Sequence, residues 1–167
     1  GYTDSAEALV RCGATVSGIQ AYAGVGRAEP LEATLREGDH DAKALVNALH
    51  RASKHGREAC VLLLLDHGAD MLAAGWQNNT ALHFAAEYGH ASVVDLLVAR
   101  GAALEAINAH GLTPLSAAVR KAVRWPAPGV DYAPAVGALV RAGASRDALE
   151  LPTGIESLAR AVSASPR

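Results

Sequence analysis

The chain has 167 residues, of which half are hydrophobic, and its formal net charge is -2 at pH 7. Such a composition is typical of a globular protein that folds without metal or disulfide, and so small a charge gives no general attraction to nucleic acid. The longest aliphatic run, residues 61–65, is too short to cross a bilayer, and the N-terminal residues lack a targeting pattern. We therefore expect a cytoplasmic protein that binds neither membrane nor nucleic acid.

Cysteine usage agrees with that location. Cys12 and Cys60 are the two cysteines, and each lies in an apolar stretch with helical periodicity. We interpret them as small core side chains of a reducing compartment, with a disulfide as the less favoured alternative.

The chain is predicted to consist of paired helices in repeating units. A residue type that caps helix N-termini opens each first helix, because its side chain accepts a hydrogen bond from a free amide of the first turn. A glycine nine residues later suits the left-handed conformation that ends the first helix, and an aliphatic second helix follows. The predicted openings are Ser17, Asn47, Thr80 and Thr113, and the glycines are Gly26, Gly56 and Gly89.

These units predict the following organisation. Residues 1–13 form a partial N-terminal unit, which is either a short cap or the cut edge of a longer array. Complete units occupy residues 17–38, 47–68, 80–101 and 113–143, and residues 153–162 form a closing helix whose Thr153 and Glu156 fit a capping box. The terminal units of such arrays are expected to be atypical because one face meets water.

The connections between units differ in length. Residues 69–79 and 102–112 are long enough for full projecting hairpins, whereas the connection from Gly38 to Asn47 is three residues shorter and predicts a stunted one. The last unit carries a nine-residue insertion near residues 124–134, rich in proline, which we expect to form a stiff loop.

The spacing between units is itself informative. Residues 80–83, Thr-Ala-Leu-His, recur 33 residues later as Thr-Pro-Leu-Ser at 113–116 and 33 residues earlier as Asn-Ala-Leu-His at 47–50. Glycines recur at the same step, and such self-similarity indicates a stacked repeat array. The chain thus resembles an ankyrin-repeat protein, with residues 75–107 as the closest copy.

The resemblance implies an all-α solenoid of helix-turn-helix units with short projecting hairpins and a concave groove. It also implies a protein that recognises another protein, as a scaffold or adaptor, and is not itself an enzyme. Two alternatives stay open: an inhibitor or immunity-type protein that blocks a partner's active site, and a regulatory or substrate-recruiting segment of a larger enzyme. We expect a monomer without cofactor.

The family places its partner contacts on the hairpin tips and on the groove side of the first helices. In this chain those positions are Lys54, His55, Trp76, Gln77, Asn79, Glu87, Tyr88, His110, Leu112, Arg120 and Lys121. Trp76 is the first choice, since it stands among glycine and polar residues, and it either anchors a partner or packs on the neighbouring hairpin. Tyr88 is the second half of such an aromatic site.

The insertion adds two more aromatic side chains, Trp125 and Tyr132. We favour the interpretation that they fold back over the exposed edge of the solenoid, and the alternative is that they anchor a partner, for which Trp125 is the candidate.

Charge along the predicted groove alternates by unit. One basic cluster consists of Arg51, Lys54, His55 and Arg57, the other of Arg120, Lys121 and Arg124, and Glu87 lies between them. If both clusters face the groove, they favour a partner with separated acidic patches, whose binding salt would weaken. For any one residue, a solvated charged face is the favoured alternative.

The sequence gives little support to metal or catalytic sites. The resemblance gives His50 and His83 a structural role, in which the imidazole bridges adjacent turns. No Cys/His pairs stand at ligand spacing, and no phosphate-binding glycine loop, G-x-S-x-G or activated Cys60 is recognisable. We expect no metal, no cofactor and no catalytic residue.

Overall fold

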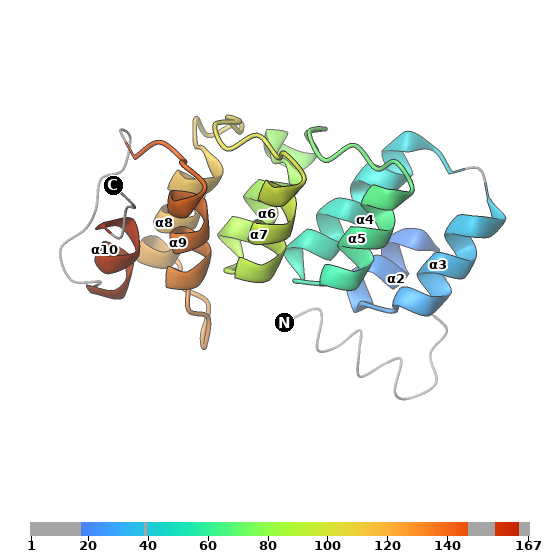
Figure 1. The fold of residues 1–167 in the computed structure, drawn as a ribbon, viewed down its shortest axis with the longest axis horizontal. Coiled ribbons are helices and arrows are strands. Elements are labelled where there is room, and N and C mark those ends of the chain that lie inside the picture. The colour runs from blue at the N-terminus through green and yellow to red at the C-terminus, as the bar shows by residue number, and fades with distance from the viewer. Residues whose placement is uncertain (1–17, 39, 147–155, 164–167) are drawn as a thin grey trace.

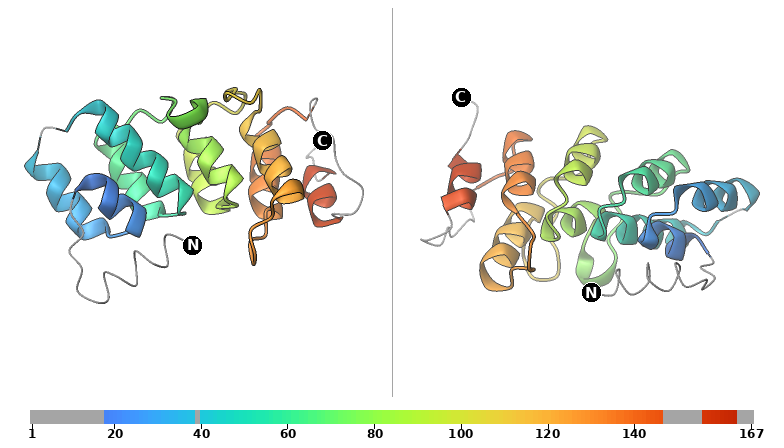
Figure 2. Two further views of the ribbon diagram at one scale, coloured as in Figure 1. Left: turned by 180° about the vertical axis from the view of Figure 1, so that it is seen from behind. Right: turned by 90° about the horizontal axis from the view of Figure 1, so that it is seen from below.

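The computed structural model describes residues 18–38, 40–146 and 156–163, and within them it holds α-helices, one short 3-10 turn and no strand. The helices form two parallel rows (Figure 1; Figure 2, right). The first-helix row comprises α2 (Ile19–Val25), α4 (Ala42–Lys54), α6 (Ala81–Glu87) and α8 (Pro114–Arg124). The second-helix row comprises α3 (Ala28–Glu37), α5 (Glu58–Asp66), α7 (Ala91–Ala99) and α9 (Ala133–Arg141), and α10 (Glu156–Ser163) packs on α9. The predicted all-α repeat fold is confirmed.

The rows differ in the side chains that join them. Successive first helices meet through fully buried alanines such as Ala48, Ala85 and Ala118. Successive second helices meet through larger side chains such as Leu64 and Leu97, which are buried to the same degree. Small side chains let helix axes approach closely, whereas leucines supply most of the apolar area removed from water.

Two helix starts are confirmed with their caps. At α6 the amide of His83 donates to Thr80 Oγ1 at 3.5 Å, and the Thr80 amide donates back to His83 Nδ1 at 3.2 Å, which closes a capping box. At α8 the amide of Ser116 donates to Thr113 Oγ1 at 3.2 Å. The hydroxyls thus satisfy amides that have no partner within their helices.

The predicted start at Asn47 is wrong. Helix α4 begins at Ala42, so Asn47 lies inside it, and the N-terminal flanking residue Asp41 makes no side-chain cap hydrogen bond. Residues 42–46 contain neither glycine nor proline, and their alanines, lysine and leucine favour helix. The helix therefore extends backwards into the segment that we expected to form a stunted hairpin, which leaves only residues 38–41 as a connection.

The turns between paired helices confirm the glycine prediction. Gly26, Gly56 and Gly89 all have positive φ angles. At Gly56 the constraint is also steric, because a Cβ atom there would lie 2.6 Å from Nδ1 of His90. The turn therefore needs glycine both for its left-handed backbone and for the histidine that packs on it.

The connections at residues 69–79 and 102–112 project from the same end of the helices (Figure 1) and are linked to each other. The amide of Ala109 donates to the carbonyl of Gln77 at 2.8 Å, and the side-chain amide of Asn78 donates to the carbonyl of Ile107 at 2.8 Å. These two hydrogen bonds join the tip of one hairpin to the next hairpin.

The insertion projects from the opposite end of the helices (Figure 1). Its Tyr132 is only 4% exposed and its phenol oxygen accepts from the amide of Ala127 at 3.2 Å, so Tyr132 folds back as favoured. Trp125 remains 59% exposed, so the covering role does not extend to it. Val130 reaches across to the preceding unit, where a Cβ atom added to Gly89 would lie 2.7 Å from its Cγ1.

Some predictions fall outside the described residues: the partial unit at 1–13, Ser17 as a helix start, Cys12, and the capping box formed by Thr153. Among the helices that the structure describes, none combines the length and the apolar character needed to traverse a bilayer.

Candidate functional site

Charge is divided unequally between the two rows of helices. The helices of the first row carry one carboxylate, Glu87, among these cations: Lys43, Arg51, Lys54, Arg120, Lys121 and Arg124. Those of the second row carry two arginines, Arg36 and Arg141, among these carboxylates: Glu29, Glu32, Glu37, Glu58, Asp66 and Asp95. The exposed side of the first row, which we call the first-helix face, is therefore basic. The second-row helices carry more carboxylates than arginines, but Arg27, Arg57 and Arg100 stand at their ends.

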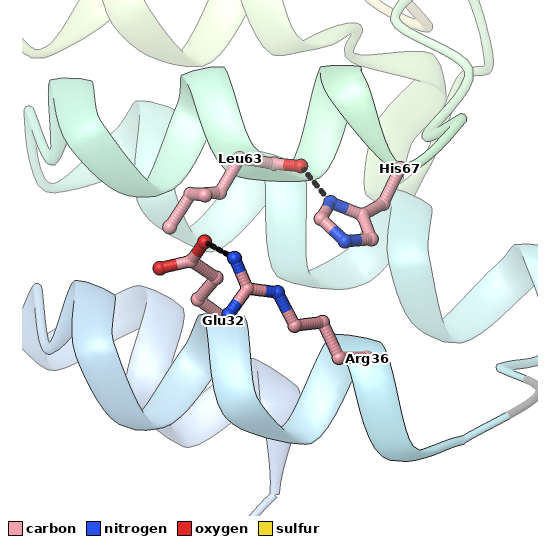
Figure 3. Close-up of polar contacts among 4 residues, drawn as sticks. All are labelled: Glu32, Arg36, Leu63 and His67. Atoms are coloured by element: carbon pink, nitrogen blue, oxygen red, sulfur yellow. Dashed lines mark hydrogen bonds and ion pairs between the residues drawn. The ribbon is translucent and has the colours of Figure 1, made fainter.

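Some charged side chains of the second row pair with each other or with an arginine at a helix end. The ion pairs are Arg36 with Glu32 at 2.5 Å, Arg100 with Asp66 at 3.1 Å, and Arg141 with Asp95 at 3.8 Å. Figure 3 shows the first of these on α3 beside α5, where His67 Nδ1 lies 2.8 Å from the carbonyl oxygen of Leu63. These side chains of the second row thus find their ion-pair and hydrogen-bond partners within the row or at its helix ends.

The cations of the first-helix face have a different environment. Within the described residues, none of the first-row lysines and arginines forms an ion pair with a carboxylate. Instead the ammonium groups of Lys54 and Lys121 lie 5.1 Å and 5.6 Å from the ring centroid of Tyr88. A cation over an aromatic face is attracted by the ring quadrupole. Tyr88 follows α6, so this stack joins α4, α6 and α8.

Beside this stack lies a trough of about 250 Å³ between α4 and α6, lined by His50, Arg51, Lys54, His55, Trp76 and Phe84. Trp76 belongs to the short 3-10 turn at the hairpin end of the trough (η1, Trp76–Asn78), and its side chain is 73% exposed. Packing on the neighbouring hairpin therefore covers little of the indole. Tyr88 does not line the trough itself, although it contacts Lys54, which does.

The backbone that carries Trp76 is held in an unusual conformation. Gln77 and Asn78 have φ angles of 55° and 58°, in the left-handed region that side chains other than glycine rarely adopt. The second hairpin stabilises both residues through the two backbone-carbonyl bonds described above, and Gln77 Oε1 lies 3.1 Å from His110 Nε2. The position of Trp76 is thus set by the neighbouring hairpin before any partner binds.

The other predicted contact residues divide by location. Asn79 is 3% exposed and its Oδ1 accepts from the side-chain amide of Asn108 at 2.9 Å, so its burial argues against a partner contact. Leu112 is half-buried, and its carbonyl oxygen meets His83. Trp125 follows α8 and does not line the trough. Glu87 and Arg120 are half-buried and lie towards the C-terminal ends of α6 and α8.

The histidines near the trough are structural. His50, His83 and His90 direct Nε2 at the carbonyl oxygens of Ala73, Leu112 and Lys54 at 3.1, 3.0 and 2.9 Å. Because a carbonyl only accepts, each Nε2 carries the proton. The predicted bridging role of His50 and His83 is confirmed.

Burial is the main reason that the pKa of each of these three imidazoles is lowered. The pKa of His55 is lowered to about 4, mainly by burial and also by the nearby positive charge of Lys54 and Arg57. His55 is therefore neutral at pH 7, and the positive charge of the trough comes from Arg51 and Lys54. Burial raises the pKa of the Cys60 thiol, which is the opposite of what a nucleophile requires. In the described residues, no group of three His, Cys, Asp or Glu side chains is placed to hold a metal ion.

Sequence reasoning missed the contributions of His50 and Phe84 to the trough and the contacts of both lysines with Tyr88. A signal was present for part of this, because His55, Tyr88 and Lys121 stand at equivalent positions of successive units. Which side chains reach across to a neighbouring helix depends on how closely the helices pack, which the repeat spacing alone does not specify.

Residues 49–125 match the family model for ankyrin repeats in three copies. This part of the chain belongs to the ankyrin-repeat family. No curated protein matches the chain significantly in sequence.

Proposed function

We propose that this chain is a scaffold or adaptor that binds another protein through the first-helix face and the adjoining hairpin tips. Ankyrin repeats are in general protein–protein interaction modules and are typically non-catalytic. The observation that carries the proposal is the pairing of an exposed tryptophan with the trough: Trp76 lies at one end of a trough whose cations have no carboxylate partner among the described residues. Large aromatic side chains in such settings concentrate binding energy.

We propose further that the protein acts as a monomer in the cytoplasm. The buried thiol of Cys60 supports a reducing compartment, because a core cysteine there stays reduced. The concentration of cations on the first-helix face supports a single binding face.

Affinity capture with a matched pair of variants tests the binding face. Trp76→Ala removes the indole, while Leu72→Ala removes another exposed side chain of the same hairpin, 54% exposed and not among those lining the trough. We expect the wild type and Leu72→Ala to capture the same partner protein in equal amounts, as measured by quantitative mass spectrometry. Trp76→Ala is expected to capture at least ten-fold less of that protein. Thermal unfolding of each variant checks that the fold is intact. If the two folded variants capture equal amounts of the partner protein, Trp76 is not part of the binding face.

A further inference from the structure

We propose that the partner presents one continuous acidic segment, which crosses α4, α6 and α8 in extended conformation and inserts one apolar side chain into the trough beside Trp76. This inference rests on the proposed function and specifies the chemistry of the partner. It replaces the expectation of two separated acidic patches.

Continuity follows from the contacts of Tyr88. Lys54 of α4 and Lys121 of α8 both place their ammonium groups over the same ring, so the two basic clusters meet at α6. Helices in contact lie about 8–10 Å apart, so the path from α4 to α8 is about 20 Å, which an extended chain covers in about six residues. One short segment therefore reaches both lysines.

Charge complementarity selects an acidic partner. The lysines and arginines of the first-helix face lack ion pairs within the described residues, whereas three ion pairs occupy the second row and its helix ends. An incoming carboxylate at the first-helix face therefore displaces no existing salt bridge. Its association is accelerated by the local positive field and weakened by salt.

The trough selects an apolar side chain within that acidic segment. Trp76 and Phe84 contribute aromatic rings to its lining, and the neutral His55 adds no charge. A trough of about 250 Å³ has room for several waters. Their release by an apolar side chain favours binding.

A polypeptide fits these features better than a nucleic acid. The whole chain is slightly negative, so a long polyanion that extends beyond the first-helix face gains no further attraction there.

The probe for this proposal is a short synthetic peptide of alternating glutamate and glycine with one central leucine, titrated into the isotopically labelled protein and followed by NMR. We expect saturable shifts of the Trp76 indole and of backbone amides in α4, α6 and α8, with an affinity that falls at least five-fold when salt is raised from about 0.05 to 0.3 M. Replacing the peptide's leucine by alanine is expected to weaken binding to the wild type about ten-fold but to have little effect on binding to Trp76→Ala, because both changes remove one contact.

A charge-reversed pair supplies the matched control. The double variant Lys54→Glu, Lys121→Glu is expected to lose at least ten-fold in peptide affinity. Arg36→Glu reverses a charge at an exposed site of α3 in the second row, and is expected to change the peptide affinity less than two-fold. Circular dichroism melting of the variants separates lost binding from lost folding.

Three outcomes would overturn the inference. They are equal binding of a peptide with lysine in place of glutamate, shifts centred on the second row, and tighter binding of a single-stranded oligonucleotide than of the acidic peptide. The proposed function is judged separately: a protein captured through Trp76 but lacking any acidic segment refutes this inference and leaves that function standing.

Discussion

The two rows of helices differ in the side chains that join them and in the pairing of their surface charges. The second row is joined by leucines and valines, and two of its carboxylates, Asp66 and Asp95, form ion pairs with arginines of the neighbouring unit. The first row is joined by alanines and buried imidazoles, and its surface cations remain available. Under the proposed function, recognition depends on the first row whereas the second row contributes packing, so substitutions in the two rows should have separable effects.

The largest effect is expected from the second row. Leu97→Ala in α7 removes a fully buried side chain and leaves a cavity, which costs about 2–5 kcal/mol of unfolding free energy. Chemical denaturation measures the loss, and Ser92→Ala on the exposed side of the same helix, expected within about 0.5 kcal/mol, is the control. A loss below about 1 kcal/mol for Leu97→Ala would mean that the second row does not carry the stability assigned to it.

The next effect depends on pH and concerns the first row. The pKa of folded His55 is lowered from 6.5 to about 4, mainly by desolvation and also by the positive charge of Lys54, Arg57, His90 and Arg51. Because the unfolded chain takes up this proton near pH 6.5 and the folded chain only near pH 4, the free energy of unfolding falls as pH is lowered between these values.

The variant His55→Gln tests that assignment, since it removes the titrating group. We expect its melting temperature to fall less steeply than that of the wild type between pH 6.5 and 4. His67→Gln, an exposed histidine at the end of α5, serves as the control. Identical slopes in all three proteins would assign the pH dependence to other groups.

A smaller effect on stability is expected from the N-terminal caps of two first-row helices, α6 and α4. Thr80→Ala removes the cap of α6 and is expected to cost about 1 kcal/mol. Asp41→Ala alters the corresponding residue of α4, where no side-chain cap bond exists, and is expected to cost less than about 0.5 kcal/mol. Equal losses in denaturant titrations would show that Asp41 stabilises α4 in another way.

The smallest effect is expected from the ion pairs of the second row. Arg100 and Asp66 are both exposed, so a double-mutant cycle with alanine at each position is expected to give a coupling of about 0–1 kcal/mol. High salt should reduce the coupling further. A coupling above about 2 kcal/mol would contradict the view that leucine packing, rather than surface charge, stabilises this row.

The sequence allowed much of the architecture to be predicted and less of the site. Thr80 and Thr113 were recognised because a capping side chain, a helix former and a glycine stand at fixed offsets, all of which act locally. The predicted helix start at Asn47 was wrong because the residues before this tetrapeptide are themselves good helix formers, so the helix already begins at Ala42. Trp76 was singled out from its polar neighbours, but the approach of Lys54 and Lys121 to Tyr88 depends on packing between helices that are far apart in sequence.

The contact of Val130 with Gly89 bears on how the array comes apart. In a solenoid each unit contacts only its neighbours, and its stability depends on the interfaces that it forms with them. Here the insertion of the fourth unit also rests on the inter-helix turn of the third, near the buried Tyr132. These two units accordingly share a contact that must break before either separates, which favours their opening as one cooperative block in hydrogen exchange.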